Sequence, residues 1–258
     1  MANTTSLKRV QRRDRVIVLL SLCAVTVLAW RYLVDMADME DLSGAMAAAM
    51  RVAPWDLTSF ALMFEMWVVM MVGMMLPSAA PMILLFATIN RNNRPRGSAY
   101  AATATFVLGY VVVWMGFSLL ATLAQGGLQS AALLSPMLES TSSQLGGLLC
   151  IAAGAYQWTP LKHICLKYCR SPLQFVLFHW REGTRGALRM GLEHGAYCLG
   201  CCGFLMGLLF AGGVMNLLWV AAIALFVLVE KLAPGGEWLG RTGGGAMIAA
   251  GVYMVSGA

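Results

Sequence analysis

The stretch His194-Gly-Ala-Tyr-Cys198-Leu-Gly-Cys201-Cys202 brings one histidine and three cysteines together within an apolar sequence. Each residue of an α-helix advances by about 100°, so these four side chains fall on one arc of about 100°. The following residues, Leu205-Met206-Gly-Leu-Leu-Phe210, indicate that this helix is embedded in a membrane. A lone cysteine in such a helix is commonly a small apolar side chain. Four soft ligands on one arc instead favour a metal site.

The rise of the helix limits how these ligands can share an ion. His194 and Cys202 are separated by about 12 Å along the axis, so a single ion cannot contact all four side chains. The pairs His194/Cys198 and Cys198/Cys202 are each one helical turn apart and can each hold an ion. We therefore expect a complete site to take further ligands from another helix.

Composition defines the fold class. Of the 258 residues, 59% are hydrophobic and only 12% are charged, whereas soluble domains carry about 25% charged residues. We predict an all-α fold, a polytopic transmembrane helical bundle of about six to seven helices. One Pro-kinked, Met-rich helix should face the helix that bears the histidine and cysteines. The expected spans are Val16–Val34, Phe60–Ile89, Ala99–Ala124, Ser143–Trp158, Met190–Phe210, Val214–Leu232 and a short Gly244–Val255.

The basic residues predict the orientation of the chain. Residues 1–15 form a basic N-terminal tail, and residues 16–258 form a single transmembrane domain with a Cys-containing loop at 159–189. If the tail and this loop are cytoplasmic, all 18 Lys and Arg residues except Arg31 and Arg51 lie in cytoplasmic segments. The C-terminus is then outside if all seven spans cross. The net charge of +6 is therefore topological, and we expect contact with membrane lipid and no nucleic-acid binding.

Methionines supply the second set of candidate ligands. Many of the 19 methionines lie in the second expected span, where Met66, Met70 and Met74 recur every fourth residue on one helix face. Methionine fills membrane cores adaptably, but thioethers also select Cu(I) among biological metals. The spacing is similar to the methionine pairs that line copper transporters. Because these residues reach the depth of the cysteines, we expect thioethers to lie opposite thiols. Pro77 and Pro81 should kink the span on its cytoplasmic side.

The cytoplasmic loop carries a further thiol pair. Cys165 and Cys169 are one turn apart on a short predicted helix between two prolines, and the basic residues Lys167 and Arg170 should favour thiolates. We expect this pair to be open to water and to exchange metal with a cytoplasmic donor. None of the seven cysteines lies in an outer loop on this topology, so structural disulfides are not expected.

Two intramembrane carboxylates and two glycine pairs complete the pattern. Glu65 points away from the methionine face and Glu230 ends the sixth span, so each is a candidate for a proton path or a second site. Arg31 is a possible partner of Glu65. Gly191-x3-Gly195 and Gly203-x3-Gly207 offer notches for close helix contact.

Taken together, these segments resemble a bacterial family of predicted metal-binding integral membrane proteins over roughly residues 60–258. The resemblance implies metal binding and a multi-pass location in the bacterial cytoplasmic (inner) membrane, but neither a metal nor a reaction. It rests on Trp67-x2-Met70-Met71-x2-Met74-Met75-x-Pro77-x3-Pro81, Tyr156-Gln157-x-Thr159-Pro160-Leu161-Lys162-x2-Cys165-x3-Cys169-Arg170-Ser171-Pro172, Trp180-Arg181-x-Gly183, His194-Gly195-x-Tyr197-Cys198-x-Gly200-Cys201-Cys202, Gly213-Val214-Met215-Asn216 and Glu230-Lys231.

Three classes of function fit this sequence. The first is an integral membrane protein that holds, delivers or moves copper, with a cytoplasmic or periplasmic metal donor or acceptor, or a partner subunit. The second is a membrane metalloenzyme or redox subunit, oxygenase-type or haem-containing, for which no catalytic residue can be assigned. The third is a helical scaffold whose cysteines only pack. Copper is the favoured metal, with zinc and haem as alternatives.

Overall fold

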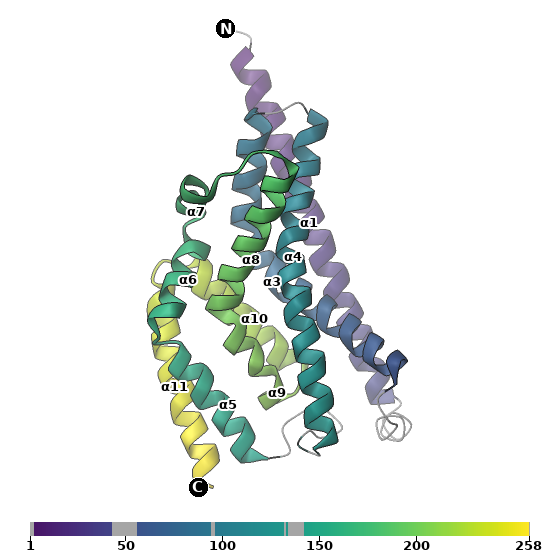
Figure 1. Cartoon of the computed structure of the whole chain (residues 1–258), viewed down its shortest axis with the longest axis vertical. Coiled ribbons are helices and arrows are strands. Elements are labelled where there is room, and N and C mark those ends of the chain that lie inside the picture. The colour runs from purple at the N-terminus through teal and green to yellow at the C-terminus, as the bar shows by residue number, and fades with distance from the viewer. Residues whose placement is uncertain (1–2, 43–55, 94–95, 132, 134–141, 258) are drawn as a thin grey trace.

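The computed structural model describes residues 3–42, 56–93, 96–131, 133 and 142–257. Within these ranges every regular element is a helix, as predicted (Figure 1). Four stretches are long and apolar enough to cross a membrane, and together they indicate a multi-pass membrane protein. They are Arg13–Asp38, Leu57–Arg91, Tyr100–Ser130 and Gly183–Gly212.

The later helices differ in length from the expected spans. Helices α5 and α10 have 14 and 16 residues, less than the ~20 that a straight span needs. Helix α11 has 21 residues and begins well before the expected Gly244. The helices are α1 (Asn3–Leu42), α3 (Leu57–Asn93), α4 (Arg96–Ser130), α5 (Ser143–Tyr156), α6 (Pro160–Arg170), α7 (Pro172–His179), α8 (Gly183–Gly207), α9 (Leu209–Gly212), α10 (Leu217–Leu232) and α11 (Gly236–Ser256).

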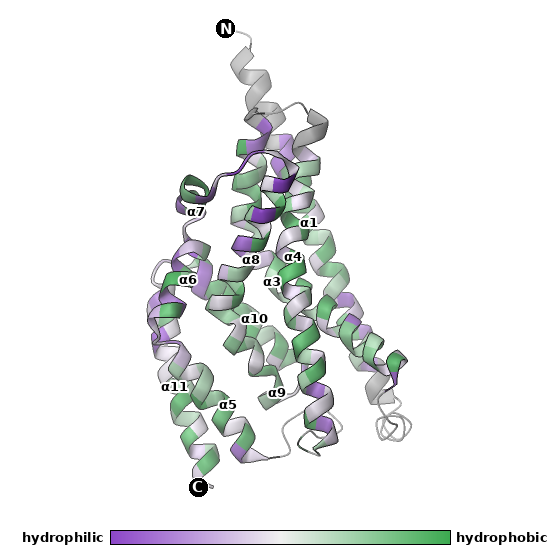
Figure 2. Ribbon diagram, in the orientation of Figure 1, coloured by the Kyte–Doolittle hydropathy of each residue, from purple (hydrophilic) through white to green (hydrophobic). Residues whose placement is uncertain are grey.

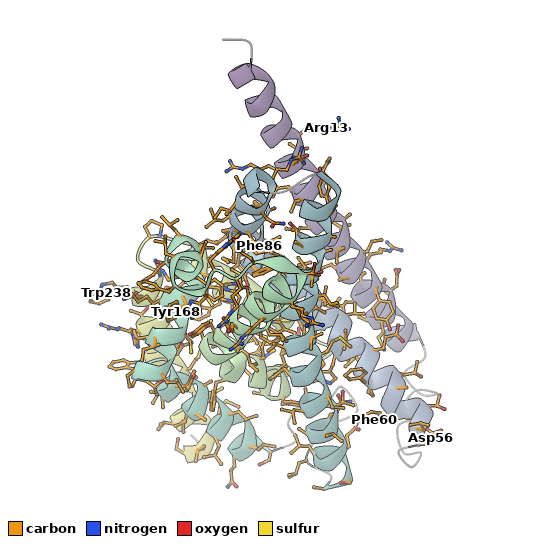
Figure 3. All side chains as sticks on the ribbon, turned by 45° about the horizontal axis from the view of Figure 1, so that its top comes forward. Arg13, Asp56, Phe60, Phe86, Tyr168 and Trp238 are labelled. Atoms are coloured by element: carbon orange, nitrogen blue, oxygen red, sulfur yellow. The ribbon has the colours of Figure 1, made fainter. Side chains whose placement is uncertain are left out.

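The long helices form a bundle in which α8 packs on α4, and α3 contacts both α4 and α1. Helices α5 and α11 form a second pair beside the bundle (Figure 1). Apolar residues dominate the middle of α3 and α4, whereas hydrophilic residues gather at the start of α8 and in the segment that leads to it from α7 (Figure 2). Side chains fill the space between the helices (Figure 3), with Phe86 at 1% exposure in the interior and Trp238 at 71% on the outside.

Glycines set the contact between α4 and α8. A Cβ atom on Gly191 would collide with the carbonyl oxygen of Phe106, and one on Gly109 with that of Leu188. The notch predicted at Gly191 and Gly195 is therefore confirmed, since Gly195 also faces α4 through Val113. The notch predicted at Gly203 and Gly207 is wrong: a Cβ on Gly203 would meet only its own helix, and one on Gly207 would meet open space.

Helix α3 runs without interruption through Pro77 and Pro81. Just before the first proline, the carbonyl oxygen of Met75 accepts hydrogen bonds from Ser78 Oγ at 2.8 Å and Tyr110 Oη at 3.0 Å. The Tyr110 bond ties α3 to α4 at the depth of Met75.

The segment predicted as a loop at 159–189 folds largely into helices. Thr159 caps α6, where its side chain accepts from the backbone N–H of Lys162, and Pro172 begins α7. Helix α6 then packs along α8. The Oη of Tyr156 donates to the carbonyl oxygen of Gly200 at 2.5 Å, which fastens the end of α5 to α8. The cysteine-bearing segment is thereby held against the bundle.

Replacing Gly191 by Leu should separate α4 from α8, because the added side chain would occupy the position of the Phe106 carbonyl oxygen. We expect the free energy of unfolding to fall by about 1–3 kcal/mol. The measurement is the thermal unfolding midpoint of the purified protein in detergent. Gly207→Leu is the matched control, since nothing lies within 4 Å of the added Cβ. Equal midpoints for the two variants would contradict this packing.

Candidate metal centre

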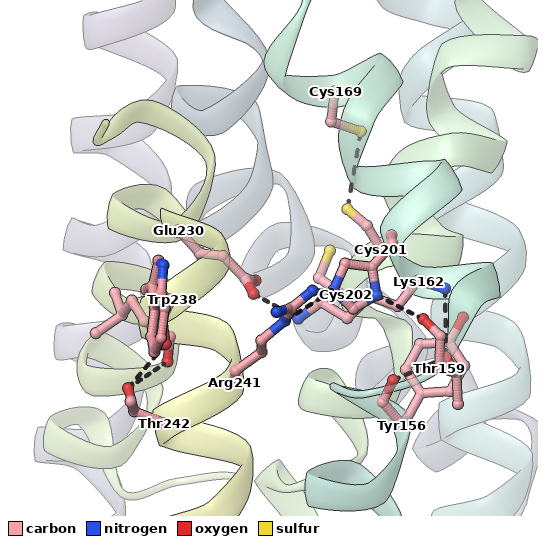
Figure 4. Close-up of polar contacts among 12 residues, drawn as sticks. Tyr156, Thr159, Lys162, Cys169, Cys201, Cys202, Glu230, Trp238, Arg241 and Thr242 are labelled. Atoms are coloured by element: carbon pink, nitrogen blue, oxygen red, sulfur yellow. Dashed lines mark hydrogen bonds and ion pairs between the residues drawn. The ribbon is translucent and has the colours of Figure 1, made fainter. Parts of the chain in front are cut away.

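A buried sulfur cluster lies where α3, α6 and α8 meet, and we define it as Met75, Cys169, Cys198, Cys201 and Cys202. Cys201 Sγ lies 3.7 Å from Cys169 Sγ, and Cys202 Sγ lies 3.7 Å from Met75 Sδ. Figure 4 shows the first of these contacts, between α6 and α8. Cys198, Cys201 and Cys202 are at most 1% exposed. The α8 sulfurs therefore meet sulfur atoms from two other helices.

The backbone of α8 orients two of these thiols. The Sγ atoms of Cys201 and Cys202 donate to the carbonyl oxygen of Cys198 at 3.1 and 2.9 Å. Both thiols thus point from one turn of α8, Cys201 toward α6 and Cys202 toward α3. Cys198 belongs to the same turn, so its position sets the geometry of the cluster.

The Cys198 sulfur contacts two polar side chains from other helices. Tyr110 Oη of α4 lies 3.1 Å from Cys198 Sγ, and Lys231 Nζ of α10 lies 2.9 Å from it. Lys231 Nζ also donates to Ser78 Oγ of α3 at 3.1 Å. Five helices therefore contribute side chains within or directly around the cluster.

From the sequence, Lys231 and Lys162 were counted only as topological charges in cytoplasmic segments, but the structure buries both side chains. Lys231 is 5% exposed and Lys162 is 2% exposed. Lys162 Nζ pairs with Glu230 Oε1 at 2.6 Å (Figure 4). The signal available in the sequence was the Glu230-Lys231 pair directly after an apolar run, because charges in such a position are commonly buried for a purpose.

His194 lies in an aromatic surround one turn before Cys198. Its ring centroid is 6.1 Å from that of Phe106, 5.8 Å from Tyr110 and 5.2 Å from Phe175. The side chain is 2% exposed, and its Nδ1 has no hydrogen-bond partner among the described residues. A buried nitrogen without a partner is costly, and ligation of a metal is one way to satisfy it.

The methionine face is buried, but the contact with a cysteine involves a different methionine from the predicted ones. Met66, Met70 and Met74 are at most 2% exposed. The sulfur that touches Cys202 belongs to Met75, which follows Met74 and was left out of the predicted ligand set. The expectation that thioethers and thiols reach the same depth holds for Met75, and ligation by Met66, Met70 and Met74 stays a prediction.

From the sequence, the loop thiols were expected to be open to water, but Cys165 is buried and Cys169 is partly buried. Cys165 is 8% exposed and packs against Gly200, whose lack of a side chain makes room for the sulfur. Cys169 is half-buried and joins the cluster through Cys201. Their surroundings also disfavour the expected thiolates. Burial raises the pKa of Cys165, and hydrogen bonding with Cys198 and Cys201, followed by burial, raises the pKa of Cys169 well above its ordinary value.

The two candidate carboxylates lie in different surroundings. Glu65 is exposed on the outer face of α3. Its suggested partner Arg31 pairs instead with Asp35 at 2.8 Å. Glu230 is 1% exposed, and its Oε2 has no hydrogen-bond partner among the described residues, while its Oε1 holds Lys162. A proton or second-site role for either residue stays a prediction.

The donor set favours a soft, low-coordinate ion. Among the described residues, no three His, Cys, Asp or Glu side chains converge as they would around a closed zinc site, which normally has four such ligands. The contacts found instead join thiol to thiol and thiol to thioether at 3.7 Å. Thiolate and thioether ligands together select Cu(I).

The fold and the cluster define a class: a multi-pass helical membrane protein with a buried cluster of thiols and a thioether. The chain belongs to the PpoB2 family, described as a copper chaperone family, which matches residues 64–254. Its function is thus that of a copper chaperone, and the prediction of copper is confirmed. The resemblance found in the sequence was to predicted metal-binding membrane proteins without a stated metal, and the family match now states copper. No curated protein and no solved structure matches the chain.

Met75→Leu should lower copper retention by about tenfold, because it removes the thioether that touches Cys202 and keeps the volume and apolarity of the side chain. The measurement is the copper-to-protein ratio after dialysis against a Cu(I) chelator. Met66→Leu, also buried, is the comparison. If Met66→Leu loses copper and Met75→Leu does not, the predicted Met66–Met70–Met74 face carries the metal instead.

Proposed function

We propose that this copper chaperone holds Cu(I) within the membrane on cysteine thiolates of α8 and the thioether of Met75, and passes it to a partner protein. The observation that carries the proposal is the Met75–Cys202 contact at 3.7 Å in a site closed to water. A soft monovalent ion matches these ligands better than Mg²⁺, Ca²⁺ or Mn²⁺ does. Exclusion of water also protects reduced thiols and Cu(I) from side reactions.

The arrangement of sulfurs supports stepwise movement of the ion. Cys169 on α6 is the most exposed member of the cluster, and its Sγ lies 3.7 Å from that of Cys201. Cys202 lies on the other side, in contact with Met75 of α3. Cu(I) can advance along this row by exchanging one sulfur ligand at a time. Each thiol that binds releases its proton, and each thiolate that lets go of the ion takes one up, whereas the thioether of Met75 exchanges no proton. Cys169 is then the receiving ligand, and Cys198 and Cys202 with Met75 form the holding site.

His194 and Cys165 complete the proposed assignment. His194, whose Nδ1 has no hydrogen-bond partner among the described residues, lies one turn before Cys198, toward the N-terminal end of α8 that follows α7. We assign it as an accessory ligand at the receiving side. Cys165, packed on Gly200, sits one turn before Cys169 and is assigned to the same step.

The orientation we propose has the N-terminus in the cytoplasm of a bacterial cell and the C-terminus outside the inner membrane. In support, α1 begins and α11 ends at opposite ends of the molecule (Figure 1). Helices α6 and α7 then face a cytoplasmic donor, and the acceptor is periplasmic. A C-terminal epitope should be accessible to antibody in spheroplasts with an intact inner membrane; protection until permeabilisation would contradict this orientation.

Cys198→Ser should abolish stoichiometric copper binding, because it removes the central sulfur of the α8 thiols, which contacts Tyr110 Oη and Lys231 Nζ, and leaves the backbone carbonyl that orients Cys201 and Cys202 in place. Copper content of the full-length protein, purified without chelator, measures this. Cys23→Ser, on the exposed face of α1, is the matched control and should retain wild-type copper.

Cys169→Ser should act on the rate of loading. We expect Cu(I) transfer from a colorimetric Cu(I) chelator to slow by about tenfold, with final occupancy close to that of the wild type. If the Cys169→Ser protein loses all copper while the Cys198→Ser protein keeps it, the holding site is on α6 and not on α8.

A further inference from the structure

Lys231 is a buried cation whose contacts are a cysteine sulfur and a hydroxyl group. Its ammonium nitrogen reaches the sulfur of Cys198 at 2.9 Å and the hydroxyl of Ser78 at 3.1 Å. The neighbouring carboxylate, Glu230, points to Lys162 at 2.6 Å. Within the residues that the structure describes, no carboxylate forms an ion pair with Lys231. A positive charge at 5% exposure is costly unless a negative charge offsets it.

That negative charge arises when Cu(I) binds, because the thiols that ligate the ion lose their protons. An ion of charge +1 held by two thiolates and a neutral thioether forms a complex of net charge −1. With the ammonium group of Lys231 beside Cys198, the complete site is electrically neutral. A divalent ion on the same ligands forms a neutral complex, so the site would then retain the uncompensated charge of Lys231. In a low-dielectric interior, this difference of one unit charge is large.

We propose that Lys231 is the counter-ion that makes the centre selective for a monovalent metal over divalent ions such as Zn²⁺. The inference rests on the proposed function, because it takes the ligands to be cysteines of α8 with Met75. The fixed ammonium group does not ligate the metal; it acts through the sulfur of Cys198. Zn²⁺ is the relevant competitor, since cysteine and histidine are also its ligands.

The surrounding contacts separate this role from that of a structural lysine. The buried Lys162–Glu230 pair joins α6 to α10 and is already balanced in charge. Arg170 donates to the carbonyl oxygens of Glu230 and Ala233 at 3.1 and 2.8 Å, which fixes the end of α10. These contacts hold α10 in place without Lys231, whose ammonium group contacts the cluster at Cys198.

The test compares two full-length variants with the wild type in detergent. Lys231→Gln removes the charge but keeps hydrogen-bond donors, whereas Lys231→Arg keeps the charge. Each protein is equilibrated under reducing, anaerobic conditions with buffered Cu(I) and Zn²⁺, and the bound metals are measured. We expect Lys231→Gln to lower the ratio of bound copper to bound zinc by at least about tenfold. Lys231→Arg should keep the ratio within about threefold of the wild type.

Ser78→Ala is the matched control, because it removes one contact of the ammonium group and leaves its charge in place. Its metal ratio should equal that of the wild type. If the wild type retains no copper, the proposed function fails. If the wild type retains copper and Lys231→Gln keeps the wild-type ratio, only the selectivity inference is overturned.

Loss of folding is also informative. If Lys231→Gln does not accumulate as a monodisperse protein, Lys231→Met replaces it, because the apolar stem is kept and the charge is removed. A shifted metal ratio in Lys231→Met supports the inference. If neither neutral variant folds while Lys231→Arg does, Lys231 stabilises the bundle itself, and the selectivity role is overturned.

Discussion

The close approach of α4 and α8 is the constraint on which the metal centre depends. Gly109 and Gly191 bring the two backbones so near that neither position admits a Cβ atom. Tyr110, the residue after Gly109, is thereby positioned to reach both Cys198 Sγ and the Met75 carbonyl oxygen. One tyrosine thus sets the spacing between the cysteine helix and the methionine helix. The 3.7 Å sulfur contact between Cys202 and Met75 follows from that spacing.

A second layer of the structure deals with charge. The buried lysines come from different helices, and each serves a different group: Lys162 pairs with Glu230, and Lys231 contacts Cys198. Arg170 completes this layer at the carbonyl end of α10, where a cation is favourable. Buried charges in a membrane protein usually mark function, and here Lys231 reaches both the cysteine helix through Cys198 and the methionine helix through Ser78. The sulfurs are therefore enclosed by apolar side chains together with buried charged groups.

Much of this arrangement could be predicted from the sequence because its periodicity is strong. Apolar runs predicted the long helices, and the spacing of His194, Cys198 and Cys202 predicted a common face of α8. Glycine spacing identified the notch at Gly191, but the same pattern at Gly203 was misleading, since a notch needs a facing helix. The choice between Met74 and Met75 depends on the rotation of α3 about its axis, and the bond from Tyr110 to the Met75 carbonyl oxygen helps to fix it.

The remaining features depend on tertiary contacts that no local pattern contains. The burial of Cys165 follows from Gly200 on another helix, and the same packing brings Cys169 to Cys201. Lys231 is next to the end of an apolar run, so a charge count treats it as a boundary residue. Only the fold of α10 against α3 and α8 reveals its contact with Cys198.

The central claim is that copper is held by sulfur atoms inside the membrane domain. X-ray absorption spectroscopy at the copper edge, on full-length protein purified with its copper under reducing conditions, tests it most directly. The account predicts a Cu(I) edge and a first coordination shell dominated by sulfur, with the sulfur contribution reduced in Met75→Leu. A first shell made only of nitrogen or oxygen atoms, or a Cu(II) edge under these conditions, would contradict it.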